Sequence, residues 1–217
     1  MHKCILFWII SCIPLVTWQI KYEKGHDGMI EIIFYGRGGQ GAVTASEILA
    51  KSAFREGKYS HAFPYFQGER KGAPVTAYAR ISEAPIEVRG PIAKSDIVLI
   101  LDSALVKTIN PLNSLKANGL AIINTNKSPE EIMSFSVNKD IQVDTIDATA
   151  LSEKIYGKSS IPKVNVAMLG FFSARTKIIK VESILASVDE YFTGDNAAQA
   201  KESVKLAYNY AAKNKEE

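Results

Sequence analysis

Residues 29–58, with the sequence MIEIIFYGRGGQGAVTASEILAKSAFREGK, join three predicted elements without a linker between them. The β-branched and aromatic residues between Ile30 and Phe34 predict a strand that is mostly buried. After a glycine-rich turn, apolar residues recur at helical spacing from Ala45 to Ala53, and this stripe predicts an amphipathic helix. Such a strand–turn–helix unit is typical of α/β domains.

The turn GRGGQG holds four glycines within six positions. A Cβ atom there would block tight turning or the close approach of a ligand. Free backbone N–H groups and the positive end of a helix dipole converge at such a turn, which favours an anion, typically phosphate. Arg37 and Gln40 either reach that ligand or a partner subunit, or simply tolerate an exposed turn. The candidate cofactor-binding residues are Gly36, Arg37, Gly38, Gly39, Gln40 and Gly41.

The spacing Gly36-x-Gly38-x-x-Gly41 also satisfies the fingerprint of dinucleotide-binding domains. A nicotinamide site further requires an acidic residue about 20 positions later, where it holds the ribose. The corresponding segment, Tyr59–Phe63, contains no acid. A nucleoside-triphosphate P-loop is excluded, since the turn lacks a lysine followed by serine or threonine. Three interpretations stay open: a phosphate-bearing ligand, NAD, or glycines that serve only close packing.

Composition narrows the possible chemistry. The chain has 217 residues, 47% of them apolar and 23% charged, with a formal net charge of +3. These values are ordinary for a globular protein and do not favour nucleic acid as a partner. Both cysteines, Cys4 and Cys12, lie at the start, and of the three histidines only His61 lies within residues 29–217. We therefore predict no catalytic residue, no metal site and no iron–sulfur ligand in the main body.

Residues 1–28 differ in character from the rest. An apolar run, Cys4–Trp18, follows Lys3 and is interrupted by Pro14. It is short for a membrane span, which needs about 20 apolar residues, and it lacks a convincing signal-peptide cleavage site. It is therefore interpreted as an upstream extension before a true start at Met29, as a targeting or anchoring segment, or as a structural element. Residues 29–217 are predicted to form one domain without a membrane span.

The remaining pattern alternates strands with helices. Five further strands are predicted at Tyr59–Phe63 (ended by Pro64), Val75–Ile81, Asp96–Leu101, Leu120–Asn124 and Ile141–Ile146, and Pro85–Val88 is a candidate strand pairing with Val75–Ile81. Helices are predicted at Leu112–Ala117, after a capping Ser128, and at Asp147–Tyr156, Val164–Ser173, Val181–Phe192 and Asn196–Lys213. This alternation predicts an α/β fold in which a mostly parallel sheet carries helices on both faces and the chain ends in helices.

Some polar residues outside the turn are also candidates. A charged run between Gly68 and Gly72 lies beside aromatic residues, and this combination favours a protein interface over a merely solvated loop. The predicted interface residues are Phe63, Tyr65, Phe66, Glu69, Arg70 and Lys71.

Asp102 and Asp147 follow buried strands, where such folds bind ligands, yet helix capping explains both more simply. His61 has no obvious partner and is expected to be structural. Asn165 is expected to be either a helix cap or a buried hydrogen-bonding residue.

Taken together, these motifs resemble the gamma subunits of 2-oxoacid:ferredoxin oxidoreductases, most closely the pyruvate type. The resemblance covers essentially all of residues 29–217 and none of 1–28. It rests on GRGGQG at 36–41, TASEILAKSA at 44–53, FPYFQGERKGAPV at 63–75, INTNKSPEEI at 123–132, DATAL at 147–151 and VNVAMLGFF at 164–172. The family usually has a second arginine at the position of Lys71. Lysine departs from that pattern but keeps the positive charge.

The resemblance implies a Rossmann-like, three-layer α/β subunit of a cytoplasmic complex with alpha, beta and delta partners. Such a complex converts pyruvate, coenzyme A and oxidised ferredoxin into acetyl-CoA, carbon dioxide and reduced ferredoxin. Thiamine diphosphate, Mg and the iron–sulfur clusters are expected on the other subunits, and this chain alone is expected to bind no cofactor. The turn Gly36–Gly41 is expected to contact coenzyme A or a partner subunit. Two alternatives stay open: a free-standing dinucleotide-binding oxidoreductase domain, and a pure assembly module.

Overall fold

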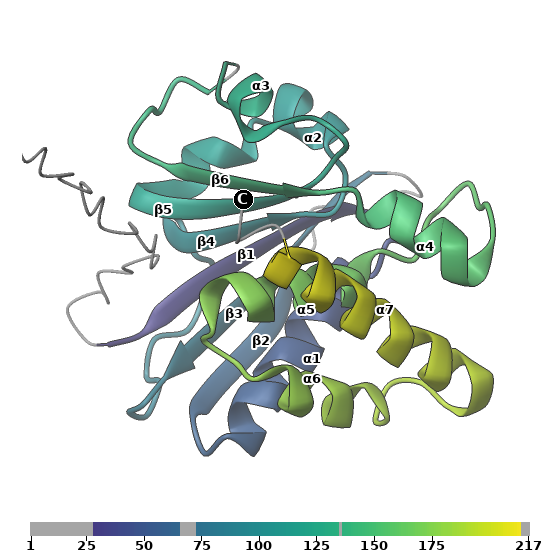
Figure 1. Ribbon diagram of the computed structural model, residues 1–217. Helices are drawn as coiled ribbons and strands as arrows, with labels where there is room; N and C mark the ends of the chain where they lie inside the picture. Colours follow the sequence, from purple (N-terminus) through teal and green to yellow (C-terminus); the bar gives the residue numbers. More distant parts are fainter. Residues whose placement is uncertain (1–27, 66–72, 135, 214–217) are drawn as a thin grey trace, which may run out of the picture.

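The computed structural model describes residues 28–65, 73–134 and 136–213. Its sheet has the strand order β2-β3-β1-β4-β5-β6 (Figure 1). β1, β4, β5 and β6 run parallel, whereas β3 is antiparallel to both β1 and β2. The strands are β1 Ile30–Arg37, β2 Tyr59–Tyr65, β3 Pro74–Ser82, β4 Ser95–Ile100, β5 Leu115–Asn124 and β6 Gln142–Ile146. The prediction of a mostly parallel sheet is confirmed.

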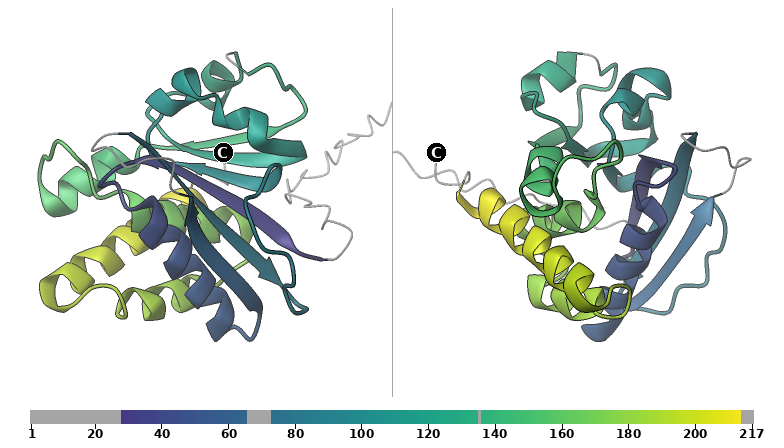
Figure 2. Two further views of the ribbon diagram at one scale, coloured as in Figure 1. Left: turned by 180° about the vertical axis from the view of Figure 1, so that it is seen from behind. Right: turned by 90° about the vertical axis from the view of Figure 1, so that its right-hand side faces the viewer.

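Helices cover both faces of this sheet and complete three layers (Figure 2). The larger group is α1 Ala42–Arg55, α4 Ala148–Tyr156, α5 Asn165–Thr176, α6 Val181–Val188 and α7 Gly194–Lys213. The opposite face carries α2 Ala104–Thr108, the 3-10 helix η1 Pro111–Ser114 and α3 Pro129–Ser134.

The central strands are apolar throughout because both of their faces are buried. In β1, Ile32 and Phe34 belong to the core beneath α1 and α5, while Ile33 belongs to the core beneath α2. β4 divides in the same way, with Leu99 in the first core and Val98 in the second. All five side chains are at most 1% exposed. A continuous apolar run is what a parallel strand between two helical layers requires.

The predicted break at Pro64 is wrong. β2 continues through Pro64, which lies opposite Ala77 of β3, and ends at Tyr65. β2 is an edge strand, and a proline is tolerated there because one side of the strand has no neighbour to pair with.

Two other predicted elements are also wrong. The expected helix at Leu112–Ala117 is a short 3-10 turn that ends at Ser114, after which Leu115 begins β5 and pairs with Ser95. The expected strand Pro85–Val88 pairs with no strand of the described sheet. The backbone carbonyl of Val88 instead accepts a 3.4 Å hydrogen bond from the Arg80 side chain.

The apolar run of residues 4–18 and the charged run of residues 69–71 lie outside the described residues. Among the residues that are described, no helix is long and apolar enough to cross a membrane.

Candidate functional site

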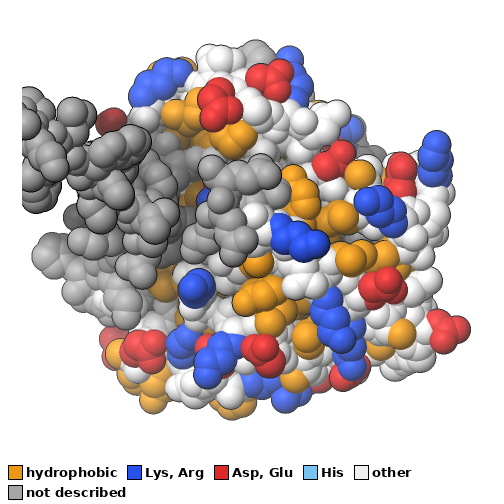
Figure 3. Space-filling model, in the orientation of Figure 1, with side chains coloured by type: hydrophobic (Ala, Val, Ile, Leu, Met, Phe, Trp, Pro, Cys, Tyr) orange, Lys and Arg blue, Asp and Glu red, His pale blue; other side chains and the backbone are white. Residues whose placement is uncertain are grey.

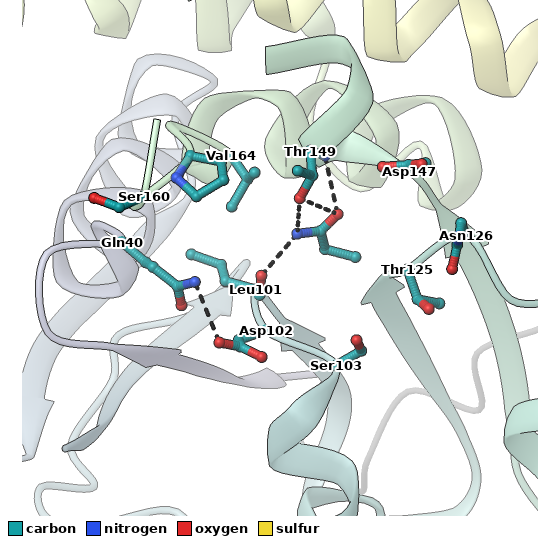
Figure 4. Close-up of a pocket in the computed structure, with 12 residues that line it drawn as sticks. Gln40, Leu101, Asp102, Ser103, Thr125, Asn126, Asp147, Thr149, Ser160 and Val164 are labelled. Carbon is teal, nitrogen blue, oxygen red and sulfur yellow. Dashed lines mark hydrogen bonds between the residues drawn. The ribbon is translucent and has the colours of Figure 1, made fainter. Parts of the chain in front are cut away.

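A polar cleft of about 400 Å³ lies at the carboxyl ends of the parallel strands (Figure 4). It is lined by Gln40 after β1, by Asp102 after β4, by Thr125 after β5 and by Asp147 after β6. The helices that follow β1 and β4 pack on opposite faces of the sheet. The cleft therefore occupies the topological switch point, where open α/β sheets bind their ligands.

The glycine turn borders this cleft through Gln40. Gly39 and Gly41 have φ of +94° and +77°, which L side chains rarely adopt. The turn is closed by the N–H of Gln40, which donates to the carbonyl of Arg37 at 3.0 Å, and by the N–H of Gly38, which donates to the carbonyl of Ala73 at 3.2 Å. Gly41 occupies the N-cap position of α1, with no side-chain cap. The first N–H groups of α1 therefore have no intrahelical partner, as at any helix start.

Close packing also constrains these glycines. A Cβ at Gly41 would lie 2.5 Å from Nδ2 of Asn165, and one at Gly39 would lie 3.3 Å from Cδ1 of Ile161. The packing interpretation thus has direct support at Gly41, whereas at Gly39 the Ile161 side chain need move by only a few tenths of an ångström. Asn165 is buried as expected, but it is the first residue of α5, and the capping position belongs to Val164.

Asp102 joins both polar side chains of the turn. Its Oδ2 pairs with Nε of Arg37 at 2.9 Å and lies 3.5 Å from Nε2 of Gln40. The Oε1 of Gln40 in turn accepts the backbone N–H of Arg37 at 2.8 Å. The carboxylate of Asp102, which follows the neighbouring strand β4, therefore orients both Arg37 and Gln40. Their side chains make specific contacts within the turn.

The capping interpretation is confirmed for Asp147, the N-cap residue of α4, whose Oδ1 accepts the N–H of Ala150 at 2.8 Å. For Asp102 it is wrong in detail: the N-cap residue of α2 is Ser103, and Asp102 lies one residue earlier, where its Oδ1 accepts the N–H of Ala104 at 2.9 Å. Both residues nevertheless line the cleft as well.

Sequence reasoning missed Asn124 and Thr149. Asn124 Nδ2 donates to the carbonyl of Leu101 at 2.9 Å and to Oγ1 of Thr149 at 3.0 Å, while its Oδ1 accepts the N–H of Thr149 at 3.1 Å (Figure 4). Asn124 thereby links the ends of β4 and β5 to the start of α4. The sequence did contain a signal for Asn124, because it is a polar residue at the end of an apolar strand, and ligands bind at this edge of such sheets.

The predicted interface residues that are described lie together on β2. The rings of Phe63 and Tyr65 lie 5.1 and 5.8 Å from the ring of Tyr78. His61 stacks near Phe63 at 5.0 Å, which agrees with a structural role. Burial raises the pKa of Tyr78, and the nearby hydroxyls of Tyr35 and Tyr65 raise it further. Phe66, Glu69, Arg70 and Lys71 lie outside the described residues.

Other site types find little support. Over residues 28–65, 73–134 and 136–213, no group of three or more His, Cys, Asp or Glu could hold a metal ion. Acidic and basic side chains are mixed over the face seen in Figure 3, so that face carries no large patch of one charge.

The strand beside β1 argues against a dinucleotide site. In a dinucleotide-binding unit the second parallel strand lies next to the first and carries the ribose-binding acid at its carboxyl end. Here antiparallel β3 occupies that place, and Pro74 lies opposite Arg37 at this edge.

A family model described as pyruvate ferredoxin/flavodoxin oxidoreductase matches residues 31–210. The chain belongs to this family. The common gamma subunit of the pyruvate/ketoisovalerate oxidoreductases of Pyrococcus abyssi is 44% identical over 179 residues, which cover 81% of this chain and 95% of the relative. The pyruvate synthase subunit PorC of Methanothermobacter thermautotrophicus is 41% identical over 180 residues, covering 83% of this chain and 94% of the relative.

Two solved structures share the fold. The pyruvate oxidoreductase subunit PORC of Thermotoga maritima matches with a TM-score of 0.72 at 29% identity, covering 83% of this chain and 96% of that one. The 2-oxoglutarate:ferredoxin oxidoreductase of Magnetococcus marinus matches with a TM-score of 0.68 at 16% identity and covers 85% of this chain but 31% of that longer chain. The predicted fold class and the predicted gamma subunit of an oxidoreductase complex are confirmed.

Proposed function

We propose that this gamma subunit serves a complex that oxidises pyruvate, or a related 2-oxoacid, with coenzyme A and ferredoxin. Alpha, beta and delta subunits are the proposed partners, and thiamine diphosphate, Mg and iron–sulfur clusters are proposed to lie on them. The observation that carries the proposal is the near end-to-end alignment with gamma and PorC subunits at 41 to 44% identity. A cytoplasmic location is part of the proposal and rests on membership of that complex.

Within the complex, the proposed task of Gly36–Gly41 is to hold the phosphates of coenzyme A. The turn supplies glycines at positive φ and the N-terminus of a 14-residue helix, and Arg37 adds a guanidinium whose side chain is 42% exposed. Backbone N–H groups and an arginine fork are the groups that bind phosphate. The Magnetococcus marinus enzyme that shares this fold is described with coenzyme A bound.

The aromatic residues of β2 are the proposed contact with a partner subunit. Phe63 and Tyr65 reach the same edge of the sheet as the glycine turn, since Thr76 of β3 pairs with Tyr65 on one side and Tyr35 on the other. Aromatic side chains of this kind anchor protein interfaces. The neighbouring Phe66, Glu69, Arg70 and Lys71 are proposed to extend that contact.

Affinity purification of the tagged chain from its own cells tests the assignment to a complex. We expect a thiamine-binding pair and a ferredoxin-like iron–sulfur subunit to co-purify in equal amounts. A chain that purifies alone and binds NAD tightly would favour the free-standing dinucleotide domain instead.

The variant Arg37→Ala, measured in the assembled complex, tests the coenzyme A role. Loss of a charge-assisted hydrogen bond is expected to raise the KM for coenzyme A roughly 10- to 100-fold. An unchanged KM in a correctly assembled complex would eliminate this role.

A further inference from the structure

Arg37 is held through one guanidinium nitrogen by Asp102, a residue that lines the cleft. Within the described residues its guanidinium pairs with Asp102 through Nε, at 2.9 Å. Among those residues no acceptor meets its two terminal amino groups, and the side chain is 42% exposed. An arginine anchored in this way has lost much of its rotamer freedom before any ligand arrives, which lowers the entropic cost of binding.

Asp102 is itself held in place. Its side chain is 21% exposed, and its Oδ1 accepts the N–H of Ala104 at the start of α2. The remaining oxygen, Oδ2, pairs with Arg37. It also lies 3.5 Å from the amide nitrogen of Gln40 (Figure 4). The 2.9 Å ion pair is the stronger of these two links, since 3.5 Å is long for a hydrogen bond.

The loop of contacts closes through the backbone. Gln40 Oε1 accepts the N–H of Arg37 at 2.8 Å, so the backbone and the side chain of Arg37 are both fixed by groups that meet at Asp102. The carboxylate comes from the residues after β4, the strand next to β1. It therefore ties the turn to the rigid sheet, which is what a precisely placed binding group requires.

We infer that Asp102 is a positioning residue for coenzyme A binding: it aims the Arg37 guanidinium at the phosphate and acts only through Arg37. This inference rests on the proposed role of the turn. A free carboxylate beside a phosphate would repel it, and the ion pair with Arg37 removes that repulsion. The net charge that the Arg37–Asp102 pair presents is close to zero, so orientation rather than excess charge is what the pair contributes.

Steady-state kinetics of the assembled complex test the inference. The variants are Asp102→Asn, Arg37→Ala and the double variant. Asparagine retains an oxygen for the N–H of Ala104 but loses the charge that holds Arg37. We expect Asp102→Asn to raise the KM for coenzyme A roughly three- to tenfold while kcat changes less than about twofold. In the Arg37→Ala background the same substitution is expected to add no further rise.

Two further variants control for structural damage. Asp144→Asn breaks a similar carboxylate–arginine pair, with Arg175 at 2.7 and 2.8 Å, between β6 and α5. It is expected to leave the KM for coenzyme A unchanged. Asp102→Glu keeps the charge and is expected to hold the KM within about threefold of the wild type. If Asp102→Asn prevents assembly, Asp102→Ser replaces it in the same comparison with Arg37→Ala, because a serine hydroxyl can still accept the N–H of Ala104 but carries no charge for Arg37.

The outcomes separate the two proposals. A raised KM in Arg37→Ala with a wild-type KM in Asp102→Asn overturns the positioning role but leaves the coenzyme A role of the turn standing. An equal KM rise from Asp102→Asn with and without Arg37 also overturns it, because Asp102 would then act independently. A wild-type KM in Arg37→Ala removes the coenzyme A role itself, and the positioning role with it.

Discussion

At the scale of single residues, Gly41 combines two separate constraints. Its φ is +77°, and the position of an added Cβ is already occupied by the Asn165 side chain, 2.5 Å away. Gly57 shares the first constraint, with φ of +78°, but no heavy atom lies within 4 Å of its Cβ position. The two glycines therefore allow the cost of backbone strain to be separated from the cost of lost packing space.

Gly57→Ala is expected to lower the free energy of unfolding by about 1–2 kcal/mol, the cost of a left-handed L residue. Gly41→Ala is expected to cost about 1–3 kcal/mol more, because Asn165 must also move. Urea unfolding of both variants measures the difference. Equal losses would show that Asn165 gives way freely, and the packing explanation of Gly41 would then fail.

The residues of the turn could be named from sequence, but their partners could not. GRGGQG between a strand and a helix identifies the six residues and their edge of the sheet. Asp102, Asn165 and Ile161 approach the turn from segments more than 60 positions away. Spacing along the chain carries no information on such contacts, so the link between Arg37 and Asp102 appears only in three dimensions.

At the scale of elements, α5 and α7 approach unusually closely at Gly170. A Cβ on this glycine would clash with the backbone carbonyl oxygen of Val204 in α7. Alanine in the interior of a helix normally stabilises by up to about 1 kcal/mol relative to glycine. Gly170→Ala is expected to destabilise the fold by about 1–3 kcal/mol instead, since the two helices must separate. Thermal unfolding of the variant would contradict this packing if the melting temperature rose.

A second contact joins the end of α1 to the start of α6. Burial acts to raise the pKa of Glu56, but the N–H of Lys180 and the side chains of Lys58 and Ser183 outweigh it, so the pKa lies below its ordinary 4.5. Because the folded-state pKa is lowered, the stabilisation is present above the unfolded pKa and is lost as the pH falls through the folded one.

Glu56→Gln is therefore expected to be less stable than the wild type at neutral pH, with a difference that shrinks as the pH falls below 4.5. Urea unfolding across a pH series provides the measurement. A difference that stayed constant down to the acid transition would mean that the charge of Glu56 contributes nothing.

Element types followed from sequence where a local pattern and tertiary packing agree. The apolar runs of β4 and β5 and the stripe of α1 are examples, since burial dictates their composition. The errors at Pro64 and Leu115 have one cause. A proline is tolerated at Pro64 because β2 lies at the sheet edge, and Leu115 is a strand residue because Ser95 pairs with it. Both outcomes depend on which strands lie next to each other in the sheet. A short stretch of sequence does not reveal that order.

At the scale of the whole molecule, the fold provides a cleft, an anchored arginine and an aromatic edge. The two described candidate surfaces, the glycine turn and the aromatic residues of β2, meet at one edge of the sheet. Adjacent surfaces suit the proposed function, in which one subunit contacts both coenzyme A and a partner. The turn begins at the end of β1 and the aromatic residues lie on β2, and placement on strands of one sheet favours precise positioning of a bound group.

The most direct test is omission and add-back of this chain in the complex. Ferredoxin reduction is measured with coenzyme A and with pyruvate or 2-oxoisovalerate, using the partner subunits alone, this chain alone and the two together. We predict that only the combination supports coenzyme A-dependent oxidation of the 2-oxoacid. Full activity of the partners without this chain, or turnover by this chain alone, would contradict its assignment as a gamma subunit of such a complex.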